Sequence, residues 1–159
     1  MTENIAIFET NMGSFKIKLY EDMPITTNNF KKLIKDGFYD GIIFHRIIQN
    51  FMIQGGCPNG NGTGGPGYNI KDEFGTGHSN LKGTISMANT GEPNSGGSQF
   101  FINLVDNKNL DKESDTPSAH PVFGEVIEGM DVVEKIGSVQ TGMYDKPIQD
   151  VKIIKISLE

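Results

Sequence analysis

Residues 44–56 read Phe44-His45-Arg46-Ile47-Ile48-Gln49-Asn50-Phe51-Met52-Ile53-Gln54-Gly55-Gly56, the most apolar and aromatic segment of this 159-residue chain. The segment contains Arg46, the only arginine among fourteen basic residues. A guanidinium is planar and permanently charged, and it donates several hydrogen bonds in a fixed fork, which the ammonium group of lysine cannot do. Because a charge among apolar side chains is unfavourable without a partner or a task, the segment indicates a functional guanidinium at Arg46.

Short apolar or alternating runs surround this segment and predict β-strands separated by turns rich in Gly, Asn and Asp. The expected strands lie at 5–8, 15–19, 42–48, 51–54, 84–88, 98–104, 122–127 and 148–158. Helices are expected near 25–36, where Pro24 suits a first turn and Gly37 an end, and at 130–136. Many short strands with two helices, and no regular strand–helix alternation, predict a mainly β fold, either an antiparallel sheet or a closed barrel.

The composition predicts a soluble globular protein, with residues 1–159 forming a single domain. A net charge of −6 argues against nucleic acid or an anionic membrane as the partner. Since no secretory signal and no apolar run of about 18–20 residues is visible, the expected location is the cytoplasm. Cys57 is the only cysteine, which excludes an intrachain disulfide and a multi-cysteine metal site.

The sequence disfavours both a dinucleotide site and a zinc site. The glycine-rich stretch 55–67 contains G-x-G-x-x-G in two overlapping registers, but residues 66–70 do not read as the helix that a dinucleotide site requires. The three histidines are too scattered for a zinc site, so no metal and no cofactor are expected. His45 alternates with Arg46 on a strand, which favours a structural role facing away from it. For His120, which precedes Pro121, the position alone allows a place in the lining of a pocket.

The remaining polar and aromatic residues form a pattern without a nucleophile or an acid–base pair. Arg46, Phe51, Met52 and Gln54 share one segment, while 86–89 and 96–103 also mix aromatic with amide side chains. Any one of these segments could be ordinary core. Together they predict a groove that binds an extended peptide with an apolar ring.

Three stretches, F-H-R-I-I-x-x-F-M-I-Q-G-G at 44–56, G-x-x-S-M-A-N at 83–89 and G-S-Q-F-F-I at 97–102, resemble the cyclophilin family of peptidyl-prolyl cis–trans isomerases. The likeness extends over nearly the whole chain. The resemblance implies a closed eight-stranded antiparallel barrel, capped by an α-helix at each open end, with a peptide groove on its outer surface. It also implies a protein-folding enzyme that accelerates rotation about Xaa-Pro bonds without a cofactor.

The resemblance assigns a role to ten residues by position. Arg46 corresponds to the catalytic arginine and Gln54 to the amide that holds the substrate. The proline pocket corresponds to Phe51, Met52, Phe101 and Leu110, with His120 at its rim. The positions that border the residue before proline correspond to Ala88, Asn89 and Gln99. The implied partners are proline-containing polypeptides, bound by a monomer. A non-catalytic proline-peptide binding module or chaperone is the alternative.

Two departures from the family pattern affect the far wall of this groove. Asn109 stands where many members carry tryptophan, which implies weakened binding of the cyclic peptide cyclosporin. The link between Leu110 and His120 is longer than is usual in the family, and it carries several charged residues. We expect the link to be a solvated insertion.

Overall fold

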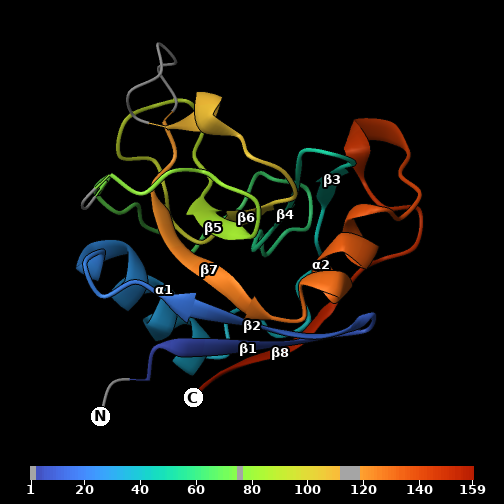
Figure 1. Cartoon of the computed structure of the whole chain (residues 1–159), viewed down its shortest axis with the longest axis horizontal. Coiled ribbons are helices and arrows are strands. Elements are labelled where there is room, and N and C mark those ends of the chain that lie inside the picture. Colours follow the sequence, from blue (N-terminus) through green and yellow to red (C-terminus); the bar gives the residue numbers. More distant parts are fainter. Residues whose placement is uncertain (1–2, 75–76, 112–118) are drawn as a thin grey trace.

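Eight strands form one antiparallel sheet in the computed structural model, which describes residues 3–74, 77–111 and 119–159. Their bounds are β1 (Ile5–Thr10), β2 (Gly13–Leu19), β3 (Arg46–Ile48), β4 (Met52–Gly55), β5 (Thr84–Met87), β6 (Phe100–Asn103), β7 (Val122–Glu128) and β8 (Ile153–Leu158). The strand order is β3-β4-β6-β5-β7-β2-β1-β8, and the sheet curls strongly (Figure 1). The mainly β fold expected from the sequence is therefore confirmed.

Two α-helices lie on opposite sides of the strands in Figure 1, α1 (Pro24–Lys35) and α2 (Met130–Gly137). Both begin and end within one residue of the predicted bounds. The N-terminus of α1 lacks a cap of its own, and the Glu73 carboxylate accepts hydrogen bonds there from the backbone N–H groups of Ile25 and Thr26. Two short 3-10 turns complete the described structure, η1 (Lys108–Leu110) and η2 (Met143–Asp145).

The expected closed barrel is wrong, because the described strands form an open half-barrel. No ladder joins the edge strands β3 and β8 in the part of the chain that the structure describes. Instead, residues 41–44, which precede β3, lie against residues 151–153, with one isolated bridge between Ile43 and Lys152. The N–H of Phe44 also donates to the carbonyl oxygen of Val151 at 2.9 Å. The chain turns into β3 after these bonds, so the two edge strands are not paired along their length.

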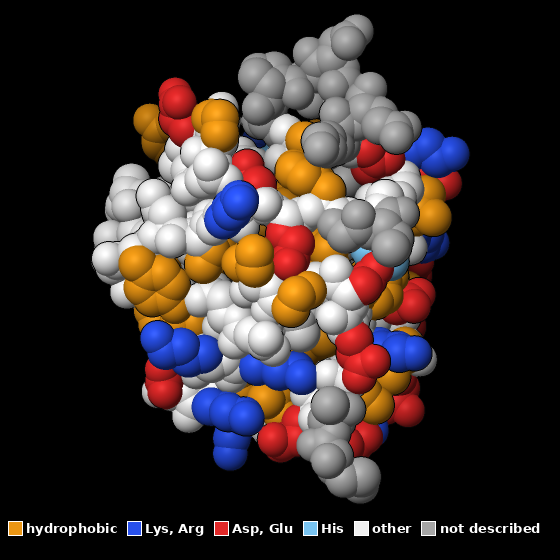
Figure 2. Space-filling model, turned by 90° about the vertical axis from the view of Figure 1, so that its left-hand side faces the viewer, with side chains coloured by type: hydrophobic (Ala, Val, Ile, Leu, Met, Phe, Trp, Pro, Cys, Tyr) orange, Lys and Arg blue, Asp and Glu red, His pale blue; other side chains and the backbone are white. Residues whose placement is uncertain are grey.

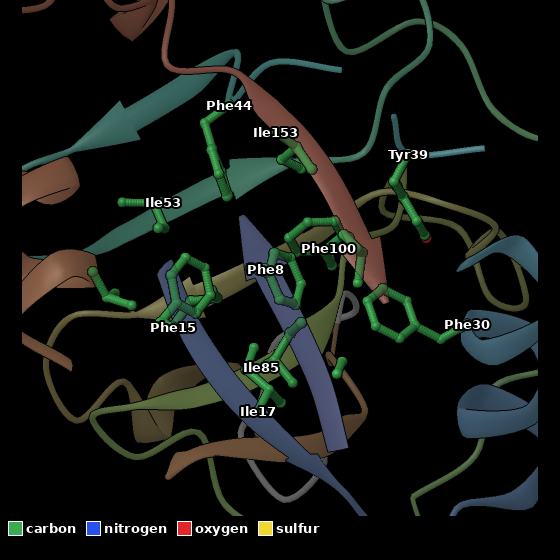
Figure 3. Packing of buried hydrophobic residues seen from close by; sticks show 14 of the residues in the cluster. Phe8, Phe15, Ile17, Phe30, Tyr39, Phe44, Ile53, Ile85, Phe100 and Ile153 are labelled. Atoms are coloured by element: carbon green, nitrogen blue, oxygen red, sulfur yellow. The ribbon is translucent and has the colours of Figure 1, made fainter. Parts of the chain in front are cut away.

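The concave face of the sheet holds the hydrophobic core, which is built largely from aromatic rings (Figure 3). Phe100 of β6 lies at its centre and meets the rings of Phe8, Phe30 and Tyr39 edge-on, with centroids 5.6–5.8 Å apart. Phe8 and Phe15 stack across β1 and β2 at 4.7 Å. Because side chains alternate along a strand, this packing leaves the intervening residues of β3, β4 and β6 on the outer face.

The three lysines of α1 do not form a free basic patch. Lys31 donates to the side-chain oxygen of Asn4 at 2.6 Å, Lys32 lies over the ring of Tyr68, and Lys35 pairs with Glu3. Lysine and acidic side chains are interspersed on the face shown in Figure 2.

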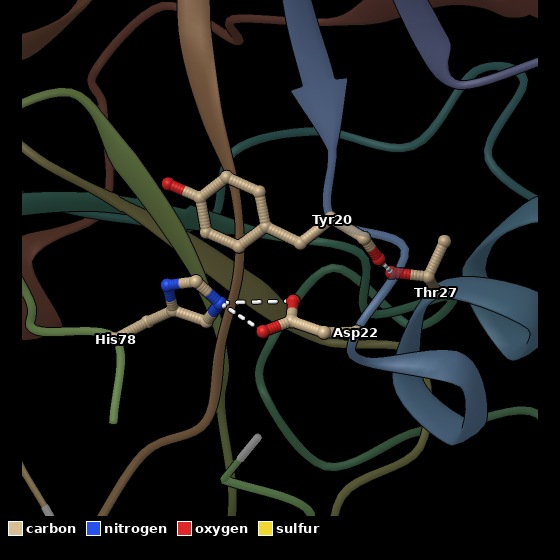
Figure 4. Close-up of polar contacts among 4 residues, drawn as sticks. All are labelled: Tyr20, Asp22, Thr27 and His78. Atoms are coloured by element: carbon tan, nitrogen blue, oxygen red, sulfur yellow. Dashed lines mark hydrogen bonds and ion pairs between the residues drawn. The ribbon is translucent and has the colours of Figure 1, made fainter. Parts of the chain in front are cut away.

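His78 makes polar and aromatic contacts with the segment that follows β2. Its Nε2 atom lies 2.9 Å from both carboxylate oxygens of Asp22, and its ring packs on Tyr20 with centroids 4.2 Å apart (Figure 4). Burial, together with the charges of Glu125 and Asp22, raises the pKa of Tyr20 to about 12. These contacts fasten the loop that contains His78 to the turn between β2 and α1.

Candidate functional site

A second apolar cluster lies on the outer face of the sheet, separate from the core. The alternation of side chains produces it, since Ile53 of β4 and Ile102 of β6 point into the core whereas their neighbours Met52 and Phe101 point outward. The cluster consists of the buried residues Met52, Ala88 and Phe101, packed against the partly buried Ile48, Phe51 and Leu110. It forms an apolar depression on the outer face of the sheet.

A chain of side-chain hydrogen bonds crosses three segments beside this cluster. Gln54 lies opposite Arg46 in the β3–β4 ladder and opposite Phe101 in the β4–β6 ladder. Nη1 of Arg46 donates to Oε1 of Gln54 at 3.4 Å, and Nε2 of Gln54 donates to Oε1 of Gln99 at 3.2 Å. A guanidinium has five N–H donors, so this bond leaves Arg46 with donors for a substrate.

The glycine-rich loop supports the far end of that chain. Nε2 of Gln99 donates to the carbonyl oxygens of Gly62 and Gly64 at 2.9 and 3.0 Å. The same two glycines donate their N–H groups to the sulfur of Cys57, each at 3.2 Å. Burial raises the pKa of the Cys57 thiol, but these and neighbouring hydrogen bonds outweigh it, and the pKa is lowered overall. The loop contains no helix between residues 56 and 69, which removes the context that a dinucleotide motif needs.

The far wall of the depression is formed by Leu110 and His120. The N–H of His120 donates to the carbonyl oxygen of Leu110 at 2.9 Å, which brings together the two ends of the long link. The His120 ring meets Phe101 edge-on at 5.1 Å, and its Nδ1 donates to the carbonyl oxygen of Met87 at 3.0 Å. Burial lowers the pKa of His120, which favours the neutral form of the ring, although the hydrogen bond to Met87 and the charge of Asp72 oppose the shift. Most of the link, residues 112–118, lies outside the described residues.

A buried polar network behind this wall was missed by the sequence reasoning. Nδ2 of Asn80 donates to the Asp111 carboxylate at 2.8 Å, while Oδ1 of Asn80 accepts from Asn103. Asn107 donates to the carbonyl oxygen of Phe51 and to Oδ1 of Asn103, both at 2.9 Å. The network ties the backbone of both pocket walls to β6. Its only sequence signal is Asn103, a polar residue at the end of an apolar strand.

The ten residues to which the sequence assigns roles are brought together in two adjoining hollows. The smaller hollow, here called the small pocket, has a volume of about 310 Å³. It is lined by Arg46, Gln54, Phe51, Met52, Ala88, Asn89, Phe101, Leu110 and His120, with Thr90 and Gly91. The larger groove, about 920 Å³, adjoins it and is lined by Gln99, again by Arg46, Gln54, Ala88 and Asn89, and by the glycine loop. Thr90 and Gly91 were not singled out from the sequence. Asn109, in η1, is exposed and does not line either hollow.

His45 is only 6% exposed, yet it lines the larger groove together with the exposed Arg46. Burial is the main cause that lowers the pKa of His45 to about 4, and the charges of Arg46 and Lys146 add to the effect. Its Nδ1 is buried without a hydrogen-bond partner among the described residues. His45 is therefore neutral near pH 7.

The described residues contain no cluster of three or more His, Cys, Asp or Glu side chains that could hold a metal. None of the described helices is long and apolar enough to cross a membrane. An apolar pocket, edged by one cation and a row of amides, is suited to binding a peptide and polarising it. These features define a candidate peptide-binding site on the outer face of a curled β-sheet.

Comparison with known proteins identifies the family. Residues 5–158 match the family model described as cyclophilin type peptidyl-prolyl cis-trans isomerase/CLD. A peptidyl-prolyl cis-trans isomerase-like 1 of Gibberella zeae is 46% identical over 160 residues, covering 98% of this chain and 94% of the relative. A peptidyl-prolyl cis-trans isomerase of Acinetobacter baylyi is also 46% identical, covering 95% of this chain and 83% of the relative.

A solved structure agrees with these relatives. The crystal structure of a cyclophilin type peptidyl-prolyl cis-trans isomerase from Cryptosporidium parvum superposes with a TM-score of 0.90 at 31% identity, covering 98% of this chain and 97% of that chain. The chain therefore belongs to the cyclophilin-type family and is a peptidyl-prolyl cis–trans isomerase.

Proposed function

We propose that Arg46 drives this isomerisation by stabilising the twisted Xaa-Pro amide, without a covalent intermediate. The observation that carries the proposal is the position of Arg46, which lines both hollows and is held by Gln54 at 3.4 Å. If a proline ring occupies the pocket and the preceding chain follows the groove, the amide that joins them would pass the guanidinium.

The chemistry of the bond explains why a cation suffices. An Xaa-Pro bond rotates slowly because amide resonance must be lost, with a barrier of about 18–20 kcal/mol. The prolyl nitrogen regains a lone pair when resonance is lost, and a guanidinium can donate to it at that moment. An interaction made only in the transition state accelerates the reaction, and a preorganised donor contributes about 2.7–4 kcal/mol in comparable sites.

The remaining site residues hold the substrate on either side of the bond. We propose that the pocket formed by Phe51, Met52, Phe101 and Leu110, with His120 at its rim, holds the pyrrolidine ring while the acyl side rotates. Gln54 and Asn89 would anchor the chain, and Ala88 and Gln99 would border the residue before proline. The ring would then stay fixed while the acyl side rotates about the Xaa-Pro bond between them.

We propose proline-containing polypeptides as substrates and a monomer as the working form. The cyclophilin from Cryptosporidium parvum was also solved in the presence of the dipeptide Ala-Pro, and that structure has a TM-score of 0.89 with this chain at 31% identity. This likeness supports the choice of ligand. Weakened cyclosporin binding is proposed from Asn109, which contributes no ring to the pocket.

NMR exchange spectroscopy tests the proposal against the alternative of a non-catalytic binding module or chaperone. An Ala-Pro peptide gives separate cis and trans signals that exchange over tens of seconds when uncatalysed. Catalytic amounts of the protein should produce exchange within seconds, and Arg46→Ala should remove most of this effect while the peptide still binds. Binding without faster exchange in the wild type would favour the module.

A further inference from the structure

The hairpin-like segment 140–148, which includes η2, is a tightly closed rim beside Arg46. The N–H of Gly142 donates to the carbonyl oxygen of Lys146 at 2.8 Å, and the N–H of Ile148 donates to that of Gln140 at 3.0 Å. Residues 141 and 147 form an isolated bridge between these bonds. The rim is therefore a defined structure rather than a loosely held connection.

Two large apolar side chains project from the tip of this rim. Met143 is 79% exposed and Tyr144 is 87% exposed. Tyr144 and Asp145 both have left-handed backbone conformations, with φ of 60° and 59°. Asp tolerates this conformation, but it is unfavourable for a bulky residue such as Tyr144, and strained residues concentrate at functional sites. The fold thus maintains an unfavourable backbone at the place where it exposes a thioether and an aromatic ring.

The rim is continuous with the proposed substrate site. Residues 143–146 line the 920 Å³ groove, opposite the glycine loop 60–66. The groove shares Arg46, Gln54 and Asn89 with the small pocket. A polypeptide with its proline in that pocket could therefore follow the groove to the rim.

We propose that Met143 and Tyr144 form a specificity site for an apolar or aromatic side chain of the substrate, near the proline in sequence. This inference rests on the proposed function of the pocket. An aromatic ring favours edge-on or stacked contact with tyrosine, and the methionine sulfur packs well against rings. The groove lined by Met143 and Tyr144 shares Arg46 with the pocket, so we expect the contact within a few residues of the proline. Asp145 and Lys146 carry opposite charges at the same rim, which leaves no preference for a charged side chain.

The experiment uses Ala-Pro peptides in which Phe or Ser occupies each of the second to fourth positions on either side of the proline. For every variant, kcat/KM on each peptide is divided by its value on the unextended peptide, and Kd is measured by calorimetry. The double variant Met143→Ser/Tyr144→Ser is compared with Ile148→Ser. Ile148 is a matched control because it is 64% exposed in the same segment but does not line the groove.

Wild type should prefer Phe over Ser at one or more positions by about three- to tenfold, the size expected for one aromatic contact. The double variant should reduce this preference to below about twofold, mainly through KM and Kd, and Ile148→Ser should keep it. The inference is overturned if wild type shows no preference, if the double variant retains it, or if Ile148→Ser loses it equally. It is also overturned if sedimentation shows that these side chains instead bury a second copy of the chain.

Failure of the proposed function gives a different result. Arg46→Ala would then exchange the unextended peptide as fast as wild type does, whatever the rim does. The Kd values for extended peptides would still report separately whether the rim selects Phe over Ser.

Discussion

The backbone N–H of His120 donates to the carbonyl oxygen of Leu110 at 2.9 Å, joining the two ends of the long link that separates them in the sequence. The N–H of Leu110 is itself bonded to the carbonyl oxygen of Asn107 at 3.0 Å, and Asp111 accepts from the N–H of Asn80 at 2.8 Å. The far wall of the pocket is thus held by bonds at its base. Its position does not depend on the number of residues between its ends.

Shortening the link should therefore leave the enzyme active. Replacing residues 112–118 with Gly-Gly should change kcat/KM on an Ala-Pro peptide by less than about twofold, because the bonds at 110, 111 and 120 remain. The matched control is Asn80→Ala in the full-length chain, which removes a partner of Asp111 and should lower stability by about 1–3 kcal/mol. A large loss of turnover in the shortened chain would show that the link itself shapes the pocket.

Phe100 and Phe101 are neighbours on β6 that face opposite sides of the sheet, so their substitutions should have different effects. Phe100→Ala opens a cavity at the centre of the core and should lower the free energy of unfolding by about 3–5 kcal/mol. Phe101→Ala should chiefly raise KM for proline peptides, because it removes one wall of the pocket. Urea unfolding measures the change in stability, and enzyme kinetics at one temperature measure the change in KM. Equal losses of activity per folded molecule would contradict the assignment of Phe101.

His45 should make the protein sensitive to acid below its ordinary titration range. Its pKa is about 4 in the folded chain and about 6.5 when unfolded. Above pH 6.5 the ring is neutral in both states. As pH falls from 6.5 towards 4, the unfolded chain gains a proton that the folded chain does not, so stability is lost over that window. By pH 4.5 the loss from this residue is about 2–3 kcal/mol.

The test compares wild type with His45→Gln by urea unfolding at pH 7.5 and pH 4.5. The variant should lose less stability between the two values, because other titrating groups contribute equally to both proteins. An identical loss in both proteins would mean that His45 titrates normally in the folded chain.

Cyclosporin should bind weakly, and Asn109→Trp should strengthen the binding. Asn109 is exposed and does not line the pocket, whereas an indole there could add apolar contact area beside Leu110. One aromatic side chain contributes about 1.5–3 kcal/mol when it is buried, which corresponds to roughly a tenfold to hundredfold change in Kd. Calorimetric titration measures the change. An unaltered Kd would indicate that another feature limits cyclosporin binding.

The strands and the outward direction of the site residues could be predicted because both depend on local alternation. Ile53 and Gln54, or Phe100 and Phe101, must point to opposite faces once the segment is a strand. The same regularity predicted the burial of His45 beside the exposed Arg46, but not that both residues line the larger groove. The catalytic and binding roles remain predictions, since geometry brings the residues together without measuring what they do.

Features that depend on contacts between distant segments could not be predicted in this way. The open seam results from how residues 41–44 meet 151–153, and neither segment contains a signal for that register. The pairing of His78 with Asp22, and of Asn80 with Asp111, likewise joins segments far apart in the chain. Neither the turn around Tyr144 nor its place beside Arg46 was predicted from the sequence.

The most direct test of the proposed mechanism compares wild type with Arg46→Ala and Arg46→Lys in a protease-coupled assay on an Ala-Pro peptide. Circular dichroism and urea unfolding serve as controls for folding, which we expect to be unaffected because Arg46 is exposed. Loss of a preorganised donor should lower kcat/KM by about a hundredfold to a thousandfold in Arg46→Ala. Arg46→Lys should also be strongly impaired, since an ammonium cannot reproduce the fork of a guanidinium. Near-normal turnover in both folded variants would contradict the role assigned to Arg46.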